Sequence, residues 1–203
     1  MDIEIAFANA EDAMKEMEGA VQHIVKEVIE KNAEELEILK LKLEIPKIKY
    51  LTFHETKKML EENGVKIGDD DLTGEAEKKL EEIFPNTLTF VTDWPMKGKP
   101  FYIMPKGENP DAELSEGFDA IYKGMEISSG GQRIHIPELL EKRLEIKGMD
   151  PKDFKEYIDS FRFGAPPHAG WSIGIERFTQ VLLEMSNVRE VCMFPRDRDR
   201  ITP

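Results

Sequence analysis

Apolar residues alternate with polar ones at the start of the chain, which is the pattern of a half-buried strand. The apolar positions are Ile3, Ile5 and Phe7. Asp2 and Glu4 fall between them. The pattern therefore predicts a first strand with one apolar face and one face that carries two carboxylates.

A long amphipathic helix is predicted directly after this strand. Asn9 precedes the first turn and Asp12 stands three residues further on, so Asn9 is the expected N-cap. Apolar residues then recur at spacings of three and four, which marks one buried stripe. The members of the stripe are Met14, Met17, Val21, Ile24, Val25 and Val28.

The middle of the chain predicts shorter elements. Residues 34–50 have no clear period and are expected to be irregular. Thr52 and Glu55 fit a capping box, which predicts a helix that runs to about residue 62 and stops at the Asn-Gly pair behind it. The further elements expected here are a helix at residues 75–84 and strands at residues 87–91 and 99–104.

The second half of the chain begins with a predicted hairpin. Its arms are residues 118–122 and 125–128, around a two-residue Lys-Gly turn. Helices are expected at residues 137–148 and 151–163, and the chain closes with a strand and a helix on either side of Gly174. Together these elements predict an α+β fold with a mostly antiparallel sheet and helices between its strands.

Charge and cysteine content limit the classes of function. The formal net charge of −13 argues against a dedicated nucleic-acid module, because phosphate binding needs a basic surface. The single cysteine, Cys192, excludes an internal disulfide framework, and its apolar neighbours predict a buried strand residue. Since no run of about 18 apolar residues occurs, we expect a cytoplasmic protein without membrane contact.

The predicted hairpin carries candidate ligands for a cation. In a regular hairpin Asp119 lies opposite Ser128, and Glu126 projects from the same face. Carboxylate and hydroxyl oxygens suit a hard cation such as Mg²⁺. A one-residue bulge would bring Ser129 to this face instead of Ser128. The alternative is a polar outer face without ligands, as we also expect for the acidic turn at residues 68–71.

The residues after the hairpin turn point to an acidic small molecule. Gly130 and Gly131 are adjacent inside a predicted strand, and such glycines mark close approach of a ligand or of another backbone. Arg133 follows them with a planar fork that can hold a carboxylate through two hydrogen bonds. Lys99 and Tyr102, on the preceding predicted strand, add a second cation and a hydroxyl.

An arginine also marks the start of the last helix. Glu176 and Arg177 stand there beside Gly174, and an arginine next to a glycine at a helix start is a candidate nucleotide contact. The alternative is an ordinary surface ion pair with a neighbouring glutamate.

Three stretches together resemble a known family. They are KPFYIM at residues 99–104, GMEISSGGQR at residues 124–133, and FGAPPHAGWSIGIER at residues 163–177, which FPRDR follows at residues 194–198. They resemble the class II aminoacyl-tRNA synthetases, and among these the aspartyl-tRNA synthetases of archaeal and eukaryotic type. The resemblance implies an antiparallel sheet flanked by helices, formed by residues 1–203 as one partial catalytic domain with a helical insert at roughly residues 34–86.

The resemblance also implies a nucleotide and metal site. Arg177 is expected to stack on or pair with ATP, and Gly174, Ile175 and Glu176 to line the same site. Glu126 is expected to meet ATP and Mg²⁺. One departure from the family is Ser172, which stands where glycine is usual, and its Cβ is expected to tighten the pocket.

An aspartate site is implied beside it. Arg133, with Lys99 and Tyr102, is expected to hold the side-chain carboxylate of L-aspartate. Ser129 is expected to touch both metal and aspartate, and Asp119 to assist at the metal. Glu4 is expected to attract the substrate ammonium.

The implied activity is that of an aspartate–tRNA ligase, which forms aspartyl-adenylate from aspartate and ATP and then transfers the aspartyl group to tRNA. The segments that carry the family's motifs 1 and 2 and the anticodon-reading barrel are absent from this sequence. We therefore expect weak or no activity from the isolated chain, a local contact with the tRNA acceptor end only, and a missing N-terminal half or a second copy as partner.

Two alternatives remain open from the sequence. One is a synthetase-like paralogue that binds ATP, an amino acid or a protein partner without charging tRNA. The other is chemistry on asparagine, although the pairing of Arg133 with Lys99 suits a carboxylate better than an amide.

Overall fold

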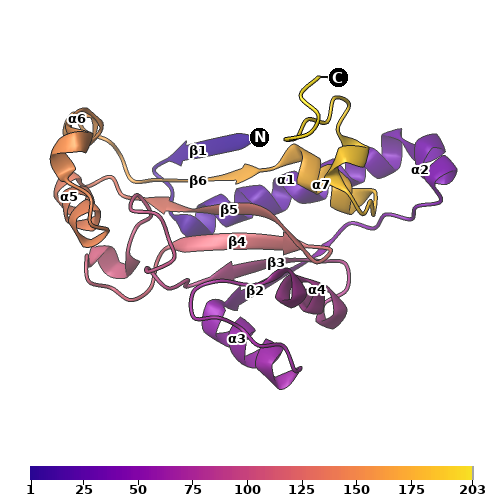
Figure 1. Ribbon diagram of the computed structural model, residues 1–203, viewed down its shortest axis with the longest axis horizontal. Helices are drawn as coiled ribbons and strands as arrows, with labels where there is room; N and C mark the ends of the chain where they lie inside the picture. Colours follow the sequence, from indigo (N-terminus) through magenta and orange to yellow (C-terminus); the bar gives the residue numbers. More distant parts are fainter. Residues whose placement is uncertain (203) are drawn as a thin grey trace.

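The computed structural model describes residues 1–202, and its centre is a six-stranded sheet with the strand order β1-β6-β5-β4-β3-β2 (Figure 1). The strands are β1 (Asp2–Ala6), β2 (Lys47–Thr52), β3 (Thr87–Thr92), β4 (Gly117–Tyr122), β5 (Met125–Arg133) and β6 (His168–Ile173). All neighbouring pairs are antiparallel except β2 and β3. The predicted α+β class with a mostly antiparallel sheet is confirmed.

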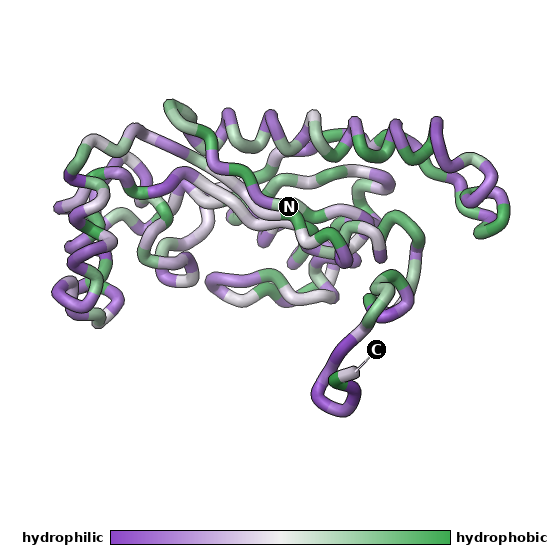
Figure 2. Tube along the Cα trace, turned by 90° about the horizontal axis from the view of Figure 1, so that it is seen from above, coloured by the Kyte–Doolittle hydropathy of each residue, from purple (hydrophilic) through white to green (hydrophobic). Residues whose placement is uncertain are grey.

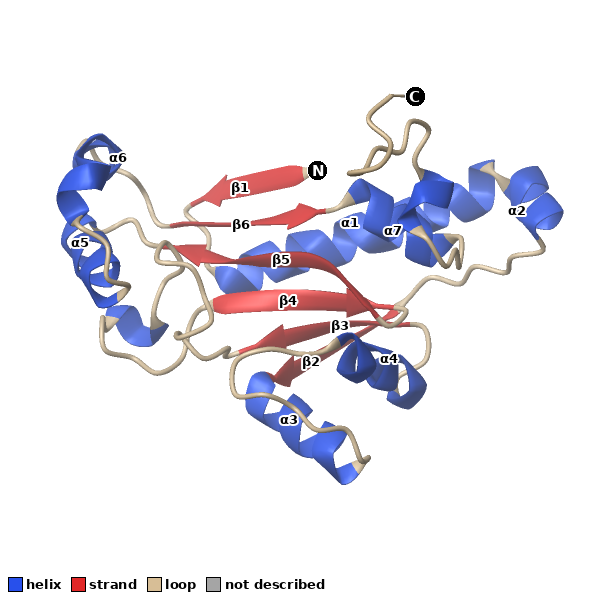
Figure 3. Cartoon of the chain, in the orientation of Figure 1, coloured by secondary structure: helices blue, strands red, loops and turns tan. Residues whose placement is uncertain are grey.

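Seven α-helices flank the sheet (Figure 3). They are α1 (Ala10–Lys31), α2 (Ala33–Leu39), α3 (Phe53–Glu62), α4 (Gly74–Ile83), α5 (Pro137–Ile146), α6 (Lys155–Arg162) and α7 (Ile175–Leu182). Short 3-10 turns occur at Lys106–Glu108, Pro151–Phe154 and Val188–Val191. In the part of the chain that the structure describes, no helix is both long enough and apolar enough to span a bilayer.

The helix α1 covers one face of the sheet. Figure 2 shows it as a long helix along one side of the molecule, with hydrophobic and hydrophilic turns alternating. Its buried residues include Met14, Met17, Val21 and Val25 from the predicted stripe, and they share a core with Phe118 and Trp171 of the sheet. The Asn9–Asp12 capping box that begins this helix is also present.

The opposite face is covered only in part. Helices α3 and α4 pack over β3 and β4 through a second core that contains Leu60, Leu80 and Ile121. Helices α5 and α6 form a third core at one end of the sheet, around Leu140 and Ile158. The central strands β5 and β6 thus keep an open stretch on this face between the two helical groups (Figure 1).

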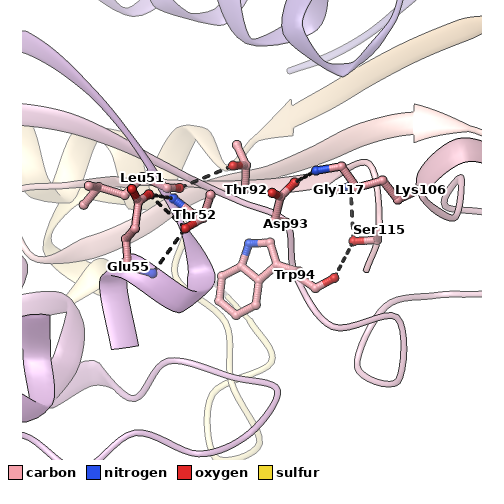
Figure 4. A network of polar contacts seen from close by, with 9 residues as sticks. All are labelled: Leu51, Thr52, Glu55, Thr92, Asp93, Trp94, Lys106, Ser115 and Gly117. Atoms are coloured by element: carbon pink, nitrogen blue, oxygen red, sulfur yellow. Dashed lines mark hydrogen bonds and ion pairs between the residues drawn. The ribbon is translucent and has the colours of Figure 1, made fainter. Parts of the chain in front are cut away.

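A polar network fixes the place where β2 and β3 end (Figure 4). Thr52 accepts a hydrogen bond from the backbone of Glu55, whose carboxylate accepts one from the backbone of Thr52, so the predicted capping box of α3 is confirmed. Beside it, Lys106 pairs with Asp93 at 2.5 Å. The buried Ser115 donates to the carbonyl of residue 94 at 3.0 Å.

Four expectations about elements were wrong. Residues 34–50 are not irregular throughout, since they contain α2 and most of the parallel edge strand β2. Residues 99–104 form no strand and touch β5 through a single bridge from Ile103 to Arg133. Phe7 lies beyond β1 with φ 59° and is 84% exposed, so it does not extend the apolar face. Cys192 follows a 3-10 turn, is half-buried and belongs to no strand.

Candidate active site on the open sheet face

Two rows of residues cross four strands on the open face of the sheet. The first row is Asp2, Ser172, Ser129 and Asp119, on β1, β6, β5 and β4 in turn. The second row is Glu4, Gly170, Gly131 and Gly117 on the same strands. Residues opposite one another in a sheet project from the same side. We call this side the site face, because it brings together residues that the sequence singled out.

A bulge in β5 decides which serine reaches the site face. The pairing changes from Ile121 opposite Glu126 to Ala120 opposite Ser128, which leaves Ile127 as the extra residue. As a result Ser129, and not Ser128, lies opposite Asp119. Ser128 is buried, with 3% of its surface exposed. The regular hairpin was therefore the wrong interpretation, and the bulged alternative is confirmed.

Asp119, Glu126 and Ser129 line a cleft of about 460 Å³. Lys99 lies in the same cleft, 2.8 Å from the Asp119 carboxylate, and both side chains are largely buried. The Lys99 ammonium also lies 4.3 Å from the centre of the Trp94 ring, which adds a cation–π contact.

The other wall of the cleft comes from the loop before α4. Asp70 and Asp71 line it, and Asp71 is exposed, so the turn is solvated as predicted but also borders the cleft. The backbone of Asp70 packs on Gly98, where a Cβ would lie 3.0 Å from the Asp70 carbonyl oxygen. Sequence reasoning missed this wall because only the placement of α3 and α4 brings the loop to the sheet.

Glu126 has an unusual electrostatic environment. Burial, and then the nearby carboxylates of Asp119 and Glu77, raise the pKa of Glu126 to about 7, while Arg177 and Lys99 oppose the rise. Crowded carboxylates of this kind gain stability when a cation binds between them. The cleft therefore favours the binding of a cation.

Arg177 approaches Glu126 from the start of α7. Its Nη1 atom lies 3.9 Å from the Glu126 carboxylate and donates to the Glu126 carbonyl at 3.3 Å. The arginine thus pairs across the site and not with its neighbour Glu176. Gly174 is the N-cap of α7, and Ile175 is 61% exposed. Among residues 1–202, the lining of the cleft includes neither Gly174, Ile175 nor Glu176.

Arg133 and Glu4 form a second polar group on the site face. The Arg133 guanidinium donates to the Glu4 carboxylate from Nη2 at 2.8 Å and from Nε at 3.1 Å. The Tyr102 ring centre lies 5.8 Å from the guanidinium carbon. The arginine fork therefore holds a carboxylate of the chain itself, and its binding of a substrate carboxylate stays a prediction.

Gly170 leaves space for the ion pair of Arg133 and Glu4. A Cβ on Gly170 would lie 2.2 Å from the Ile3 carbonyl oxygen and 2.5 Å from the Glu4 carboxylate. Only a residue without a side chain fits between β1 and β5 at this point.

The short segment around Tyr102 reaches Arg133 without being a strand. The Ile134 backbone donates to the Tyr102 carbonyl at 2.9 Å, and the Met104 backbone donates to the Gln132 carbonyl at 2.9 Å. These two bonds carry the segment alongside the end of β5. They explain why Tyr102 reaches the site face although the predicted strand was wrong.

The donor set of the cleft fits a hard cation. Asp119 and Glu126 supply carboxylate oxygens and Ser129 a hydroxyl, the ligand types that Mg²⁺ prefers. Over residues 1–202 no three His, Cys, Asp or Glu side chains converge as a complete metal site. Lys99 neutralises Asp119 in this arrangement, so further oxygen ligands would have to come from a phosphate or from water.

Comparison with known proteins places the chain in a family. The sequence profile of "tRNA synthetases class II (D, K and N)" matches residues 1–198. The whole chain is 43% identical to an aspartate–tRNA(Asp/Asn) ligase of Methanocaldococcus jannaschii, of which it covers 46%. It is 38% identical to an aspartate–tRNA(Asp) ligase of Thermoplasma acidophilum, of which it covers 47%. The chain thus spans about half the length of these relatives.

Solved structures agree with the sequence comparison. An aspartyl-tRNA synthetase from Entamoeba histolytica superposes on the whole chain with a TM-score of 0.88 and 37% identity, over 44% of its own length. An asparaginyl-tRNA synthetase from Pyrococcus horikoshii gives a TM-score of 0.90 and 30% identity, over 49% of its length. The predicted resemblance is confirmed, and the chain belongs to the class II tRNA synthetases of the D, K and N group.

Proposed function

We propose that the chain is the C-terminal catalytic portion of an aspartate–tRNA ligase. The observation that carries the proposal is the common face shared by the Arg133 fork and the cleft of Glu126, Asp119 and Ser129. Arg133, which can bind a carboxylate, then lies on the same strand, β5, as Glu126 and Ser129, which suit a cation bound to phosphate. The relatives are named as ligases, which favours this function over a paralogue that does not charge tRNA.

Arg133 is proposed to bind the side-chain carboxylate of L-aspartate. It already holds the carboxylate of Glu4 through two donors, so the substrate would take the place of Glu4 on the guanidinium. Glu4 would then be free to attract the substrate ammonium. Lys99 and Tyr102 complete the polar surroundings of the amino acid.

Glu126, Ser129 and Asp119 are proposed to hold Mg²⁺ with the phosphates of ATP. The cation, when bound, would neutralise phosphate charge. Arg177 is proposed to pair with or stack on the nucleotide, on a wall that Gly174, Ile175 and Glu176 continue. Its side chain is 59% exposed and is available for such a contact.

The proposed reaction depends on positioning and charge more than on a protein nucleophile. An oxygen of the aspartate α-carboxylate attacks the α-phosphorus of ATP, and the bond to pyrophosphate breaks. A ribose hydroxyl of the tRNA end then attacks the activated carbonyl and releases AMP. The proposed setting is the cytoplasm, with the N-terminal part of such a ligase or a second copy as partner.

The first prediction is that the isolated chain binds the substrates but turns over slowly. Calorimetry should show binding of ATP with Mg²⁺ and a preference for L-aspartate over L-asparagine. Exchange of labelled pyrophosphate into ATP, with aspartate present, should be weak or absent.

The outcomes separate the parts of this proposal. Robust exchange would contradict the expected loss of activity. No binding of ATP with Mg²⁺ would contradict the ligase assignment, and tighter binding of asparagine would contradict the choice of amino acid.

A further inference from the structure

Glu77 is a half-buried carboxylate next to the candidate cleft, and the roles proposed above do not use it. It lies in the first turn of α4, next to the fully buried Ala76. Its Oε2 atom accepts a hydrogen bond from the backbone N–H of Glu126 at 3.0 Å. This bond joins α4 to the residue that leads into the bulge of β5.

The bulge needs such partners because it interrupts the ladder between β4 and β5. Backbone groups at a bulge lose regular strand partners and must bond elsewhere. The Glu126 N–H bonds to Glu77. The Ile127 carbonyl accepts from the backbone N–H of Gly174 at 3.3 Å, in register with the pairing of β5 and β6. The bulge is thereby tied to α4 on one side and to the start of α7 on the other.

Close packing fixes the distance between α4 and the hairpin. Gly124, in the hairpin turn, has φ +72°, and a Cβ there would lie 3.2 Å from the Cα of Lys78. The main chain of α4 therefore rests directly on the turn. Glu77, the residue before Lys78, has little freedom to leave the Glu126 N–H.

The pKa of the Glu77 carboxyl is raised above its ordinary value, so its surroundings disfavour the charged form. Burial raises the pKa of Glu77, while the hydrogen bond from the Glu126 backbone and the charge of Arg177 lower it. A carboxylate out of water costs free energy unless donors and charges compensate. The compensating groups here are both parts of the candidate nucleotide site.

We propose that Glu77 is a positioning residue: it holds the backbone N–H of Glu126 and so fixes the direction in which the Glu126 carboxylate enters the cleft. In this way α4 sets the affinity of the cleft for ATP with Mg²⁺. The inference rests on the proposed function for the nucleotide, but the contact itself can be measured without any ligand.

The test compares two variants of Glu77 with a control. Glu77→Ala removes the acceptor, and Glu77→Gln keeps an acceptor oxygen without the charge. Glu75→Ala alters an exposed carboxylate in the same turn of α4. Calorimetry with ATP and Mg²⁺ should show about tenfold weaker binding for Glu77→Ala, the size expected for the loss of one hydrogen bond.

The other two variants and a titration without metal show whether weaker binding is due to the lost acceptor at Glu77. Glu77→Gln should bind nearly as well as the wild type, and Glu75→Ala should be unchanged. With ATP in EDTA the Glu77→Ala deficit should largely vanish, because the Glu126 carboxylate acts through the cation. A merely structural defect would weaken both titrations equally.

Hydrogen exchange of the Glu126 amide, followed by NMR without ligand, gives the second measurement. The amide should be protected in the wild type and in Glu77→Gln, and should exchange faster in Glu77→Ala. Equal protection in all variants, or equal affinity of Glu77→Ala and wild type for ATP with Mg²⁺, would overturn the inference. If the wild type binds no ATP with Mg²⁺, the proposed function fails, and a protected amide still supports the contact.

Discussion

At the scale of single residues, the site face depends on its glycines as much as on its charged side chains. Gly170 lets the Glu4 carboxylate lie over the sheet and meet Arg133. The sequence singled out Arg133 and Glu4 separately, but it could not show that they pair. That pairing depends on β6 lying between β1 and β5, a long-range arrangement that no local pattern encodes.

We predict that Gly170→Ala disrupts this arrangement. The new Cβ would collide with the Ile3 carbonyl and with Glu4, so β1 must shift. Thermal unfolding should show a loss of stability of about 1–3 kcal/mol, and aspartate binding should weaken. Gly19→Ala is the control, because Gly19 is exposed in α1 with no atom within 4 Å of a new Cβ; it should stabilise the chain by about 0.5–1 kcal/mol. An unchanged midpoint for Gly170→Ala would contradict the packing described.

A second residue-scale prediction concerns Arg133→Lys. Lysine keeps the charge but loses the planar fork, so calorimetry should show aspartate binding weakened about 10- to 100-fold. Asparagine binding should change less. Arg162→Lys, on the exposed end of α6, should leave both affinities unchanged. Equal losses for aspartate and asparagine would argue against a carboxylate contact.

At the scale of elements, the sequence predicted the caps and turns that are formed by residues close together in the chain. The caps of α1 and α3 and the turn at Gly124 were all correct, because each depends on residues within a few positions. The strand β2 was missed since it is an edge strand whose buried and exposed residues do not alternate regularly. The acidic loop and Glu77 were missed as parts of the site because only the docking of α3 and α4 places them there.

The cap of α3 gives an element-scale prediction. Thr52→Ala removes the acceptor of the Glu55 N–H and should lower the free energy of unfolding by about 1 kcal/mol, measured by urea titration. Thr52→Ser keeps the hydroxyl and should lose much less. If serine and alanine are equally destabilising, the lost methyl group and not the cap is responsible.

At the scale of the whole molecule, charge limits what the chain can bind alone. A formal net charge of −13 works against the binding of nucleic acid, because phosphate contacts rely on positive charge. We predict that mobility-shift titrations at physiological salt show no tRNA complex tighter than about 10⁻⁶ M, the tight end of non-specific binding. Submicromolar binding by the isolated chain would show that the acceptor-end contact is not merely local.

The bulge at Ile127 has a consequence for how the chain tolerates insertions and deletions. Side chains alternate along a strand, so the loss of one residue normally turns every later residue to the other face. Deletion of Ile127 would instead restore regular pairing and keep Ser129 opposite Asp119, because the bulge already holds one residue too many. A relative one residue shorter at this point would therefore keep the same side chains in the cleft. It would lose the Ile127 carbonyl, which accepts the hydrogen bond from Gly174 at the start of α7.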